Sequence, residues 1–194
     1  RFLLLFENIR PVGSFLDNKR VVLVAAPHQS GKDEYLMILI ILALDVDVCY
    51  LSAKWTMRRI PNPFEKSKNI DDQGIRWPLG WLQEIIFRKF GAIPVDRKGN
   101  SGQYDTVIEE LKKRDSFLLI VTPEGRFDAT RFRTSFLFIA KELNAEVMPV
   151  QIDYENEIFN ILESFNIEGD TESVVKNLRL KFDGIKGKKS RFKA

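Results

Sequence analysis

His28 and Asp33 are the two residues whose types and spacing most directly allow acid–base chemistry. They stand in "APHQSGKD" (26–33), directly after the apolar run "VVLVA" (21–25). A carboxylate five residues after a histidine, across a strand-to-helix turn, can accept from one imidazole nitrogen and leave the other to take a proton. His28 is the only histidine in the chain, which restricts imidazole chemistry to this position and excludes a multi-histidine metal site.

The same segment has two other interpretations. Residues 26–32 nearly spell a phosphate-binding loop, although Ala26 replaces its first glycine and Asp33 occupies the place of the hydroxyl that holds magnesium. That interpretation predicts a nucleotide-dependent kinase or ATPase. In the other, Asp33 only caps the following helix and His28 has no chemical role.

Two further motifs place charged residues directly after predicted strands, in "GAIPVDR" (91–97) and "TPEGRF" (122–127). Reactive groups of α/β proteins gather at the carboxyl ends of strands. There Arg97 and Arg126 can hold a phosphate through charge-assisted hydrogen bonds, and Gly125 lets backbone N–H groups approach it. Taken singly, an Asp–Arg pair after a strand is usually a surface ion pair, and a Pro-Glu-Gly sequence is usually a turn.

The order of elements predicts an α/β fold with a mostly parallel central sheet flanked by helices. A polar, proline-containing stretch over 58–74 has no periodicity and is predicted to be an inserted loop. The last helix is predicted to begin after an Asp170 N-cap. The expected strands are 21–25, 48–52, 93–95, 117–121 and 146–153, and the expected helices are 34–44, 79–90, 104–114, 135–143 and the segment "TESVVKNLRLKF".

Composition predicts one globular domain over residues 1–194, with a basic tail over about 182–194. The net charge is +3, but residues 176–194 hold eight Lys or Arg against one Asp, so this end carries +7 and the rest −4. Such an end suits an anionic membrane face or is simply a solvated terminus. No recognition motif accompanies the charge, so no nucleic-acid partner is expected.

Hydrophobic patterning adds three expectations. The apolar run 35–44 has ten residues where a bilayer span needs about 20, so it is predicted to be a buried helix or the wall of an acyl groove. Trp77, Trp81 and Phe87, at nearly helical spacing, are predicted to lie in the core or on a face that touches lipid. Cys49, the single cysteine, is predicted to be buried on a strand, in a reducing compartment.

With its motifs in this order, the sequence resembles the glycerolipid acyltransferase family, whose members acylate glycerol 3-phosphate and lysophosphatidic acid. The four stretches are "HQSGKD" (28–33), "GAIPVDR" (91–97), "TPEGRF" (122–127) and "EVMPV" (146–150), and the resemblance runs from about Val21 to Val150. It implies a glycerol-3-phosphate acyltransferase-like fold. It also implies that His28 is the general base and that Asp33 orients it and balances its charge.

The resemblance further implies that Arg97 binds the phosphate of the acceptor, helped by Glu124, Gly125 and Arg126, and that Pro149 shapes the floor of the site. The chain departs from the family pattern because Arg126 follows Gly125 directly, without the usual Thr. Arg131 or Arg133 is the substitute for Arg126, and an altered acceptor is expected.

The implied partners are an acyl thioester donor, either acyl-CoA or acyl carrier protein, a phosphorylated lipid acceptor and a membrane surface. Neither a metal nor a resident cofactor is expected. The implied location is the cytoplasmic side of a membrane, as a peripheral protein, or the cytoplasm. A non-catalytic relative that only binds lipid is the remaining alternative.

Overall fold

The structure is a computed structural model of the 194-residue chain, and it describes residues 10–12, 19–28, 33, 47–60, 74–95, 104–124 and 132–187. Internal contacts divide the chain into two compact units. Unit 1 comprises residues 1–47 and 115–194, and unit 2 comprises residues 48–114. The single domain expected over 1–194 stays a prediction.

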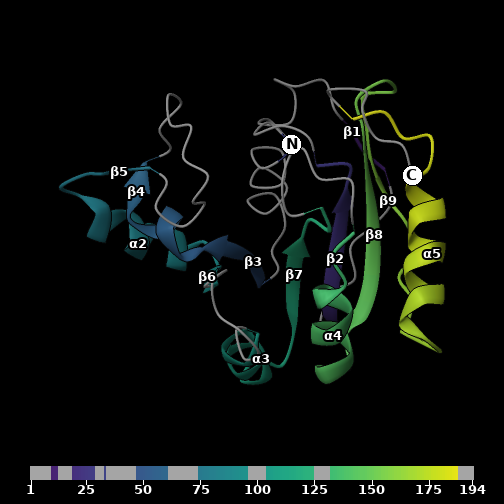
Figure 1. The fold of residues 1–194 in the computed structure, drawn as a ribbon, viewed down its shortest axis with the longest axis horizontal. Helices are drawn as coiled ribbons and strands as arrows, with labels where there is room; N and C mark the ends of the chain where they lie inside the picture. The colour runs from purple at the N-terminus through teal and green to yellow at the C-terminus, as the bar shows by residue number, and fades with distance from the viewer. Residues whose placement is uncertain are drawn as a thin grey trace. The chain divides into compact units, whose positions relative to one another are not determined.

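The sheet of unit 1 is built mainly from parallel strands. Its strands are β1 (Arg10–Val12), β2 (Arg20–Ala26), β7 (Phe117–Val121), β8 (Glu146–Asp153) and β9 (Ile158–Ile161). They are ordered β1-β9-β8-β2-β7, with β2 parallel to both β7 and β8 (Figure 1). Strand β9 returns antiparallel to β8 and pairs in parallel with β1.

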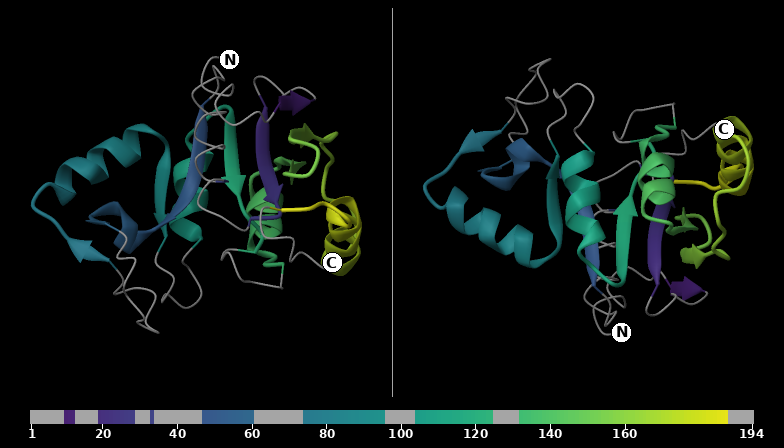
Figure 2. Two further views of the ribbon diagram at one scale, coloured as in Figure 1. Left: turned by 90° about the horizontal axis from the view of Figure 1, so that it is seen from above. Right: turned by 90° about the horizontal axis from the view of Figure 1, so that it is seen from below.

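The core of unit 1 lies around the two central strands β2 and β7. Every residue of β7 and all but the first of β2 are buried, as expected for parallel strands covered on both faces. Helix α4 (Ser135–Glu142) packs on β2 and β8, and α5 (Thr171–Phe182) packs on β8. Figure 2 shows β2 and β7 side by side from two further directions.

Helix α5 shows how the sequence sets its own boundaries. The side chain of Asp170 accepts a hydrogen bond from the backbone N–H of Ser173 at 2.9 Å, which satisfies a donor that the first helical turn leaves unpaired. Val174, Leu178 and Phe182 are spaced four residues apart and form its buried stripe. The Asp170 N-cap predicted from the sequence is therefore confirmed.

Unit 2 contains a parallel pair of strands and a short antiparallel pair. Strands β3 (Val48–Ala53) and β6 (Ala92–Val95) run parallel, and β4 (Arg59–Ile60) pairs antiparallel with β5 (Ile75–Arg76). In sequence, the 3-10 helix η2 (Lys54–Met57) follows β3, helix α2 (Gly80–Lys89) follows β5, and α3 (Asp105–Lys112) follows β6. Cys49 is fully buried in β3, as predicted.

The predicted fold class, α/β with a mostly parallel sheet flanked by helices, is confirmed. The expected strands and helices from residue 48 onward each have a counterpart, and no end differs by more than two residues. Two corrections apply. Strands β1 and β9 were not predicted, and the 58–74 segment is not loop throughout, because Arg59 and Ile60 pair with β5.

The predicted helix 34–44 lies outside the described residues. Among the described helices, none combines the length and apolarity that a membrane span requires.

Candidate active site

Three neighbouring parallel strands of unit 1 end at the same edge of the sheet. Strands β7, β2 and β8 lie side by side in that order. Just past their carboxyl ends the chain reaches Glu124 after β7, His28 after β2 and Tyr154 after β8. This edge is where α/β proteins place reactive groups, because side chains from several strands converge there. The topology of unit 1 thus gathers residues that are far apart in sequence.

His28 and Asp33 face each other at this edge. Nδ1 of His28 lies 3.5 Å from Oδ2 of Asp33, a distance that allows an ion pair when the imidazole is protonated. Asp33 is fully buried and has helical backbone, and His28 is only 6% exposed. The predicted proximity of the two side chains is confirmed, but at the distance of an ion pair, since Nδ1 makes no hydrogen bond to a group in the described part of the chain. Because Nδ1 faces the carboxylate, Nε2 is the nitrogen left to exchange a proton with a substrate.

Tyr154 is a third member of this cluster that the sequence analysis did not single out. Its hydroxyl donates a hydrogen bond to Oδ1 of Asp33 at 2.6 Å. One oxygen of Asp33 therefore accepts from Tyr154 while the other faces His28. The rule that singled out Glu124, a polar residue directly after a predicted strand, also applies to Tyr154, which follows the predicted strand 146–153.

The turn that carries Tyr154 is fixed on both of its sides. The buried carboxylate of Asp153 accepts from the backbone N–H groups of Glu155 and Asn156, at 3.0 and 3.1 Å, and from the Asn156 side chain at 2.7 Å. The backbone N–H of Tyr154 donates to the carbonyl of Lys186 at 3.0 Å. Local hydrogen bonds of this kind hold a turn in one conformation, so the hydroxyl of Tyr154 has a defined position.

Glu124 joins the cluster through the backbone of His28. Its Oε1 accepts from the His28 backbone N–H at 3.3 Å, and its side chain is buried. Its Oε2 has no hydrogen-bond partner in the part of the chain that the structure describes. A buried carboxylate oxygen without a donor costs more free energy as an anion than it does when the carboxyl is protonated and neutral.

Electrostatics act on Glu124 in the same sense. Burial raises the pKa of the Glu124 carboxyl above its ordinary value of 4.5, and the negative charge of Asp33 adds to the rise. The backbone N–H groups of Glu124 and His28 and the charge of His28 oppose the rise, each with an effect smaller than that of burial but larger than that of Asp33. The cluster therefore contains two buried carboxyl groups: Asp33, which accepts a hydrogen bond from Tyr154, and Glu124, whose pKa is raised by burial.

The predicted substrate-binding residues are only partly covered. Arg97, Gly125 and Arg126 lie outside the described residues, so their predicted roles stay predictions. Pro149 is buried inside β8, opposite Val24 of β2. It therefore lies in the strand layer beneath the edge, and its predicted role in the site floor is untested.

Only one of the two proposed substitutes for Arg126 lies in the described residues. Arg131 lies outside the described residues. Arg133 is exposed, and its backbone N–H donates to the carbonyl of Pro123 at 2.7 Å. This bond ties the start of α4 to the turn that carries Glu124. Within the described ranges, no group of three or more His, Cys, Asp or Glu side chains could hold a metal ion.

The arrangement in unit 1 is that of a buried His–Asp pair on an α/β scaffold, which can remove a proton from a substrate hydroxyl. Residues 76–153 of the chain match the family model described as Acyltransferase. The match includes Glu124 and Pro149 and begins after the His–Asp motif. It supports a general acyltransferase function, and hence a transferase enzyme. No curated protein matches the chain.

Proposed function

We propose that this protein transfers a fatty acyl group from acyl-CoA or acyl carrier protein to the hydroxyl of a glycerol-phosphate-type lipid, with lysophosphatidic acid as the first choice of acceptor. The enzyme would work in phospholipid synthesis as a peripheral protein at the cytoplasmic face of a membrane. The match over residues 76–153 supports the acyl-transfer part of this proposal. The acceptor and donor classes rest on the four sequence motifs.

The proposed reaction uses His28 as a general base. Its Nε2 takes the proton of the acceptor hydroxyl as that oxygen attacks the carbonyl carbon of the thioester. The tetrahedral intermediate collapses with cleavage of the C–S bond, and the departing thiolate takes the proton from the imidazolium. An ester and a free thiol result, and no acyl-enzyme forms.

Asp33 and Tyr154 would act through His28 and not on the substrate. The Asp33 carboxylate, 3.5 Å from Nδ1, favours the tautomer that carries its proton on Nδ1 and stabilises the imidazolium when it forms. Tyr154 holds the carboxylate from its other side, so that the group cannot rotate away. We regard both as positioning residues.

The acceptor phosphate would be bound by Arg97, with Arg126 and the backbone at Gly125 completing the site. Glu124 lies beside the backbone of His28, so a phosphate held next to it would lie near the base. The raised pKa of Glu124 suits this role, because it disfavours a second anion beside the phosphate, which would repel it. Pro149 would form part of the floor.

The observation that carries the proposal is the buried His28–Asp33 pair at the carboxyl edge of three parallel strands. A phosphate-binding loop would instead need the side chain at position 33 to reach a magnesium ion and nucleotide. Asp33 is fully buried and contacts His28 and Tyr154. This is why acid–base chemistry is preferred to nucleotide binding.

The test offers purified protein a labelled acyl thioester with glycerol 3-phosphate or one of a panel of lysophospholipids, and identifies products by mass. We expect transfer to a phosphate-bearing acceptor, and His28→Gln and His28→Ala should lower kcat by about 10²- to 10⁴-fold. Both variants should keep the melting curve and circular dichroism of the native protein.

Vesicle binding without transfer from any donor would indicate a lipid-binding relative. A rise in melting temperature with ATP and magnesium would favour the nucleotide interpretation.

A further inference from the structure

Helix α2 of unit 2 has its apolar side chains on the outside. Trp81, Leu82, Ile85 and Ile86 recur at the spacing of one helical face, and they are 57%, 37%, 46% and 42% exposed. Of the ten residues in the helix only Gly80 is buried. A helix that packs on a core shows the opposite arrangement. Three neighbours, Ile75, Leu79 and Phe90, are also 45–55% exposed.

The opposite side of α2 carries Gln83, Glu84 and the half-buried Phe87, and Gln83 fixes it to the rest of unit 2. The amide nitrogen of Gln83 donates to the backbone carbonyls of Thr56 and Arg59, at 2.7 and 3.1 Å, and its oxygen accepts from the indole N–H of Trp77 at 2.7 Å. Gln83 is therefore satisfied at both ends by groups from η2, β4 and the segment before the helix. These contacts set the rotation of the helix about its axis.

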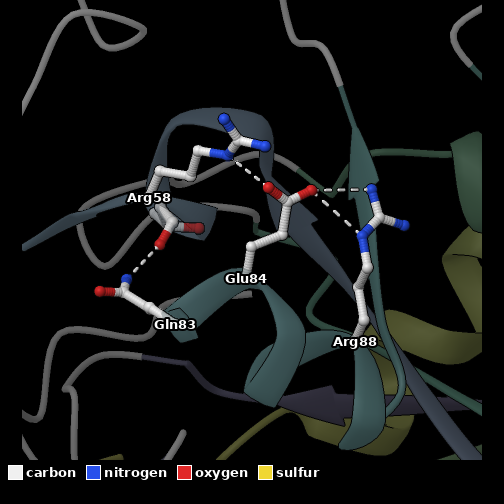
Figure 3. Close-up of polar contacts among 5 residues, drawn as sticks. Arg58, Gln83, Glu84 and Arg88 are labelled. Atoms are coloured by element: carbon white, nitrogen blue, oxygen red, sulfur yellow. Dashed lines mark hydrogen bonds and ion pairs between the residues drawn. The ribbon is translucent and has the colours of Figure 1, made fainter. Parts of the chain in front are cut away.

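An ion-pair cluster reinforces this orientation. Glu84, next to Gln83, pairs with Arg58 and with Arg88, the latter at 3.1 Å (Figure 3). The first turn also presses closely on unit 2, because a Cβ on Gly80 would lie 2.6 Å from the carbonyl oxygen of Arg58. Specific contacts on the opposite side of α2 therefore hold its apolar face toward the outside.

Cations outnumber acids in the part of unit 2 that carries this face. In residues 54–60 and 74–90, which the structure describes, there are six Lys or Arg and one acid, Glu84, for a net charge of +5. The whole chain carries only +3. Arg76, Arg88 and Lys89 are exposed beside the apolar side chains. An exposed apolar stripe that carries tryptophan and is flanked by cations matches the interface of an anionic membrane, where the indole and the cations meet headgroups.

We propose that the α2 surface, defined as Ile75, Leu79, Trp81, Leu82, Ile85, Ile86 and Phe90 with the flanking cations Arg76 and Lys89, is the face on which this protein lies on an anionic bilayer. The helix, about 15 Å long, is too short to span a membrane and would lie in the plane of the interface. The proposal rests on the proposed function only in that the acceptor is a membrane lipid. It assigns the contact to α2 and not to the basic end of the chain, which the sequence singled out.

The test compares binding to vesicles of phosphatidylcholine alone with binding to equal parts of phosphatidylcholine and phosphatidylglycerol, by co-sedimentation. The wild-type protein should bind the anionic vesicles more tightly, with a blue shift of tryptophan emission. Trp81→Gln/Ile85→Gln should weaken that binding at least tenfold. Arg76→Gln/Lys89→Gln should reduce the preference for anionic vesicles. Phe138→Gln, at an apolar position of α4 that is 49% exposed, is the matched control and should bind as the wild type does.

Two further measurements separate this proposal from its rivals. Transfer to glycerol 3-phosphate, which is dissolved in water, should be unchanged in Trp81→Gln/Ile85→Gln. If the wild type transferred the acyl group to none of the phosphate-bearing acceptors in the panel, that result would count against the proposed function alone. Unchanged vesicle binding in the double variant would overturn the role of α2. The role of α2 would also be overturned if the double variant changed from dimer to monomer in analytical ultracentrifugation and kept its vesicle binding. The face would then be an interface between two copies of the chain.

Discussion

The hydroxyl of Tyr154 donates a 2.6 Å hydrogen bond to Asp33 across 121 residues of sequence. Asp33 in turn faces His28 with its other oxygen, so the carboxylate is held between a phenol and an imidazole. Tyr154 itself is fixed by a turn that the buried Asp153 organises. The candidate base therefore depends on a chain of contacts that starts in the turn between β8 and β9.

Tyr154→Phe tests this chain of contacts. The variant removes one oxygen atom and leaves the ring, so Asp33 loses a donor to a charged group, an interaction of about 1.5–3 kcal/mol. We expect kcat to fall by about one to two orders of magnitude with KM nearly unchanged. Without that donor the carboxylate is more basic and holds the imidazolium more strongly, so the acidic limb of the pH–rate profile should move to higher pH.

The matched control is Tyr104→Phe, the same atom removed at the start of α3. It should leave both kinetic constants and the pH profile as they are. If Tyr154→Phe alters only the free energy of unfolding, with an unchanged pH profile, then the tyrosine has a purely structural role.

Asp33→Asn should move the same profile in the opposite direction. The amide keeps the size of the side chain but removes the charge that stabilises the imidazolium, and it no longer fixes the Nδ1–H tautomer of His28. We expect kcat to drop by about 10²-fold or more, and the acidic limb to move to lower pH. Steady-state rates from pH 5 to 9 would measure both effects. An activity equal to wild type would remove Asp33 from the mechanism.

Local patterns predicted the elements that form the core. The apolar runs of β2 and β7 are continuous because both strands are buried on both faces, and such runs are visible without a structure. The helix after Asp170 was visible because its cap and its four-residue apolar spacing are both local signals. His28 and Asp33 were found for the same reason, since only five residues separate them.

Features that depend on distant pairing were not predicted. Strand β1 has three residues with a proline in the middle, and its partner β9 lies far along the chain, so neither has a periodic signal of its own. The Tyr154–Asp33 bond is non-local in the same way. The spacing of Trp77, Trp81 and Phe87 predicted one apolar face, but only Trp81 lies on the outward face of α2. Trp77 donates to Gln83 on the opposite side, and the outward direction of Trp81 depends on such non-local contacts of Gln83.

Gly91 of the "GAIPVDR" motif has a structural explanation that predicts a large loss of stability on substitution. Its φ is +82°, and a Cβ there would lie 2.0 Å from the carbonyl oxygen of Val48. Gly91→Ala should therefore lower the free energy of unfolding by roughly 3–5 kcal/mol, at the upper end for single substitutions.

Gly169→Ala is the control, because its φ is also +82° but nothing lies within 4 Å of the added Cβ. It should cost only about 1–2 kcal/mol. Equal losses in urea denaturation would show that the contact with Val48 relaxes.

Glu124 is expected to make the stability of the protein fall as pH rises. Its carboxyl is buried, with a pKa above 4.5 in the folded state, so between pH 4.5 and that raised value the folded chain binds a proton that the unfolded chain has released. Over this window the free energy of unfolding decreases with pH, by up to about 1.4 kcal/mol per unit for a fully linked group. Below pH 4.5 the contribution is fully present.

Glu124→Gln should remove this dependence, because the amide is neutral at every pH and keeps an oxygen to accept from the backbone N–H of His28. We expect the variant to match the wild type below pH 4.5, to become more stable than it as pH rises through this window, and to keep a constant advantage above the raised pKa. Urea denaturation at several pH values measures the difference. Asp105→Asn, at an exposed position in α3, is the control for loss of one acidic charge and should show no such trend. A stability difference between Glu124→Gln and wild type that is constant with pH would mean that Glu124 is already ionised in the folded protein, and its proposed place beside a phosphate would have to be abandoned.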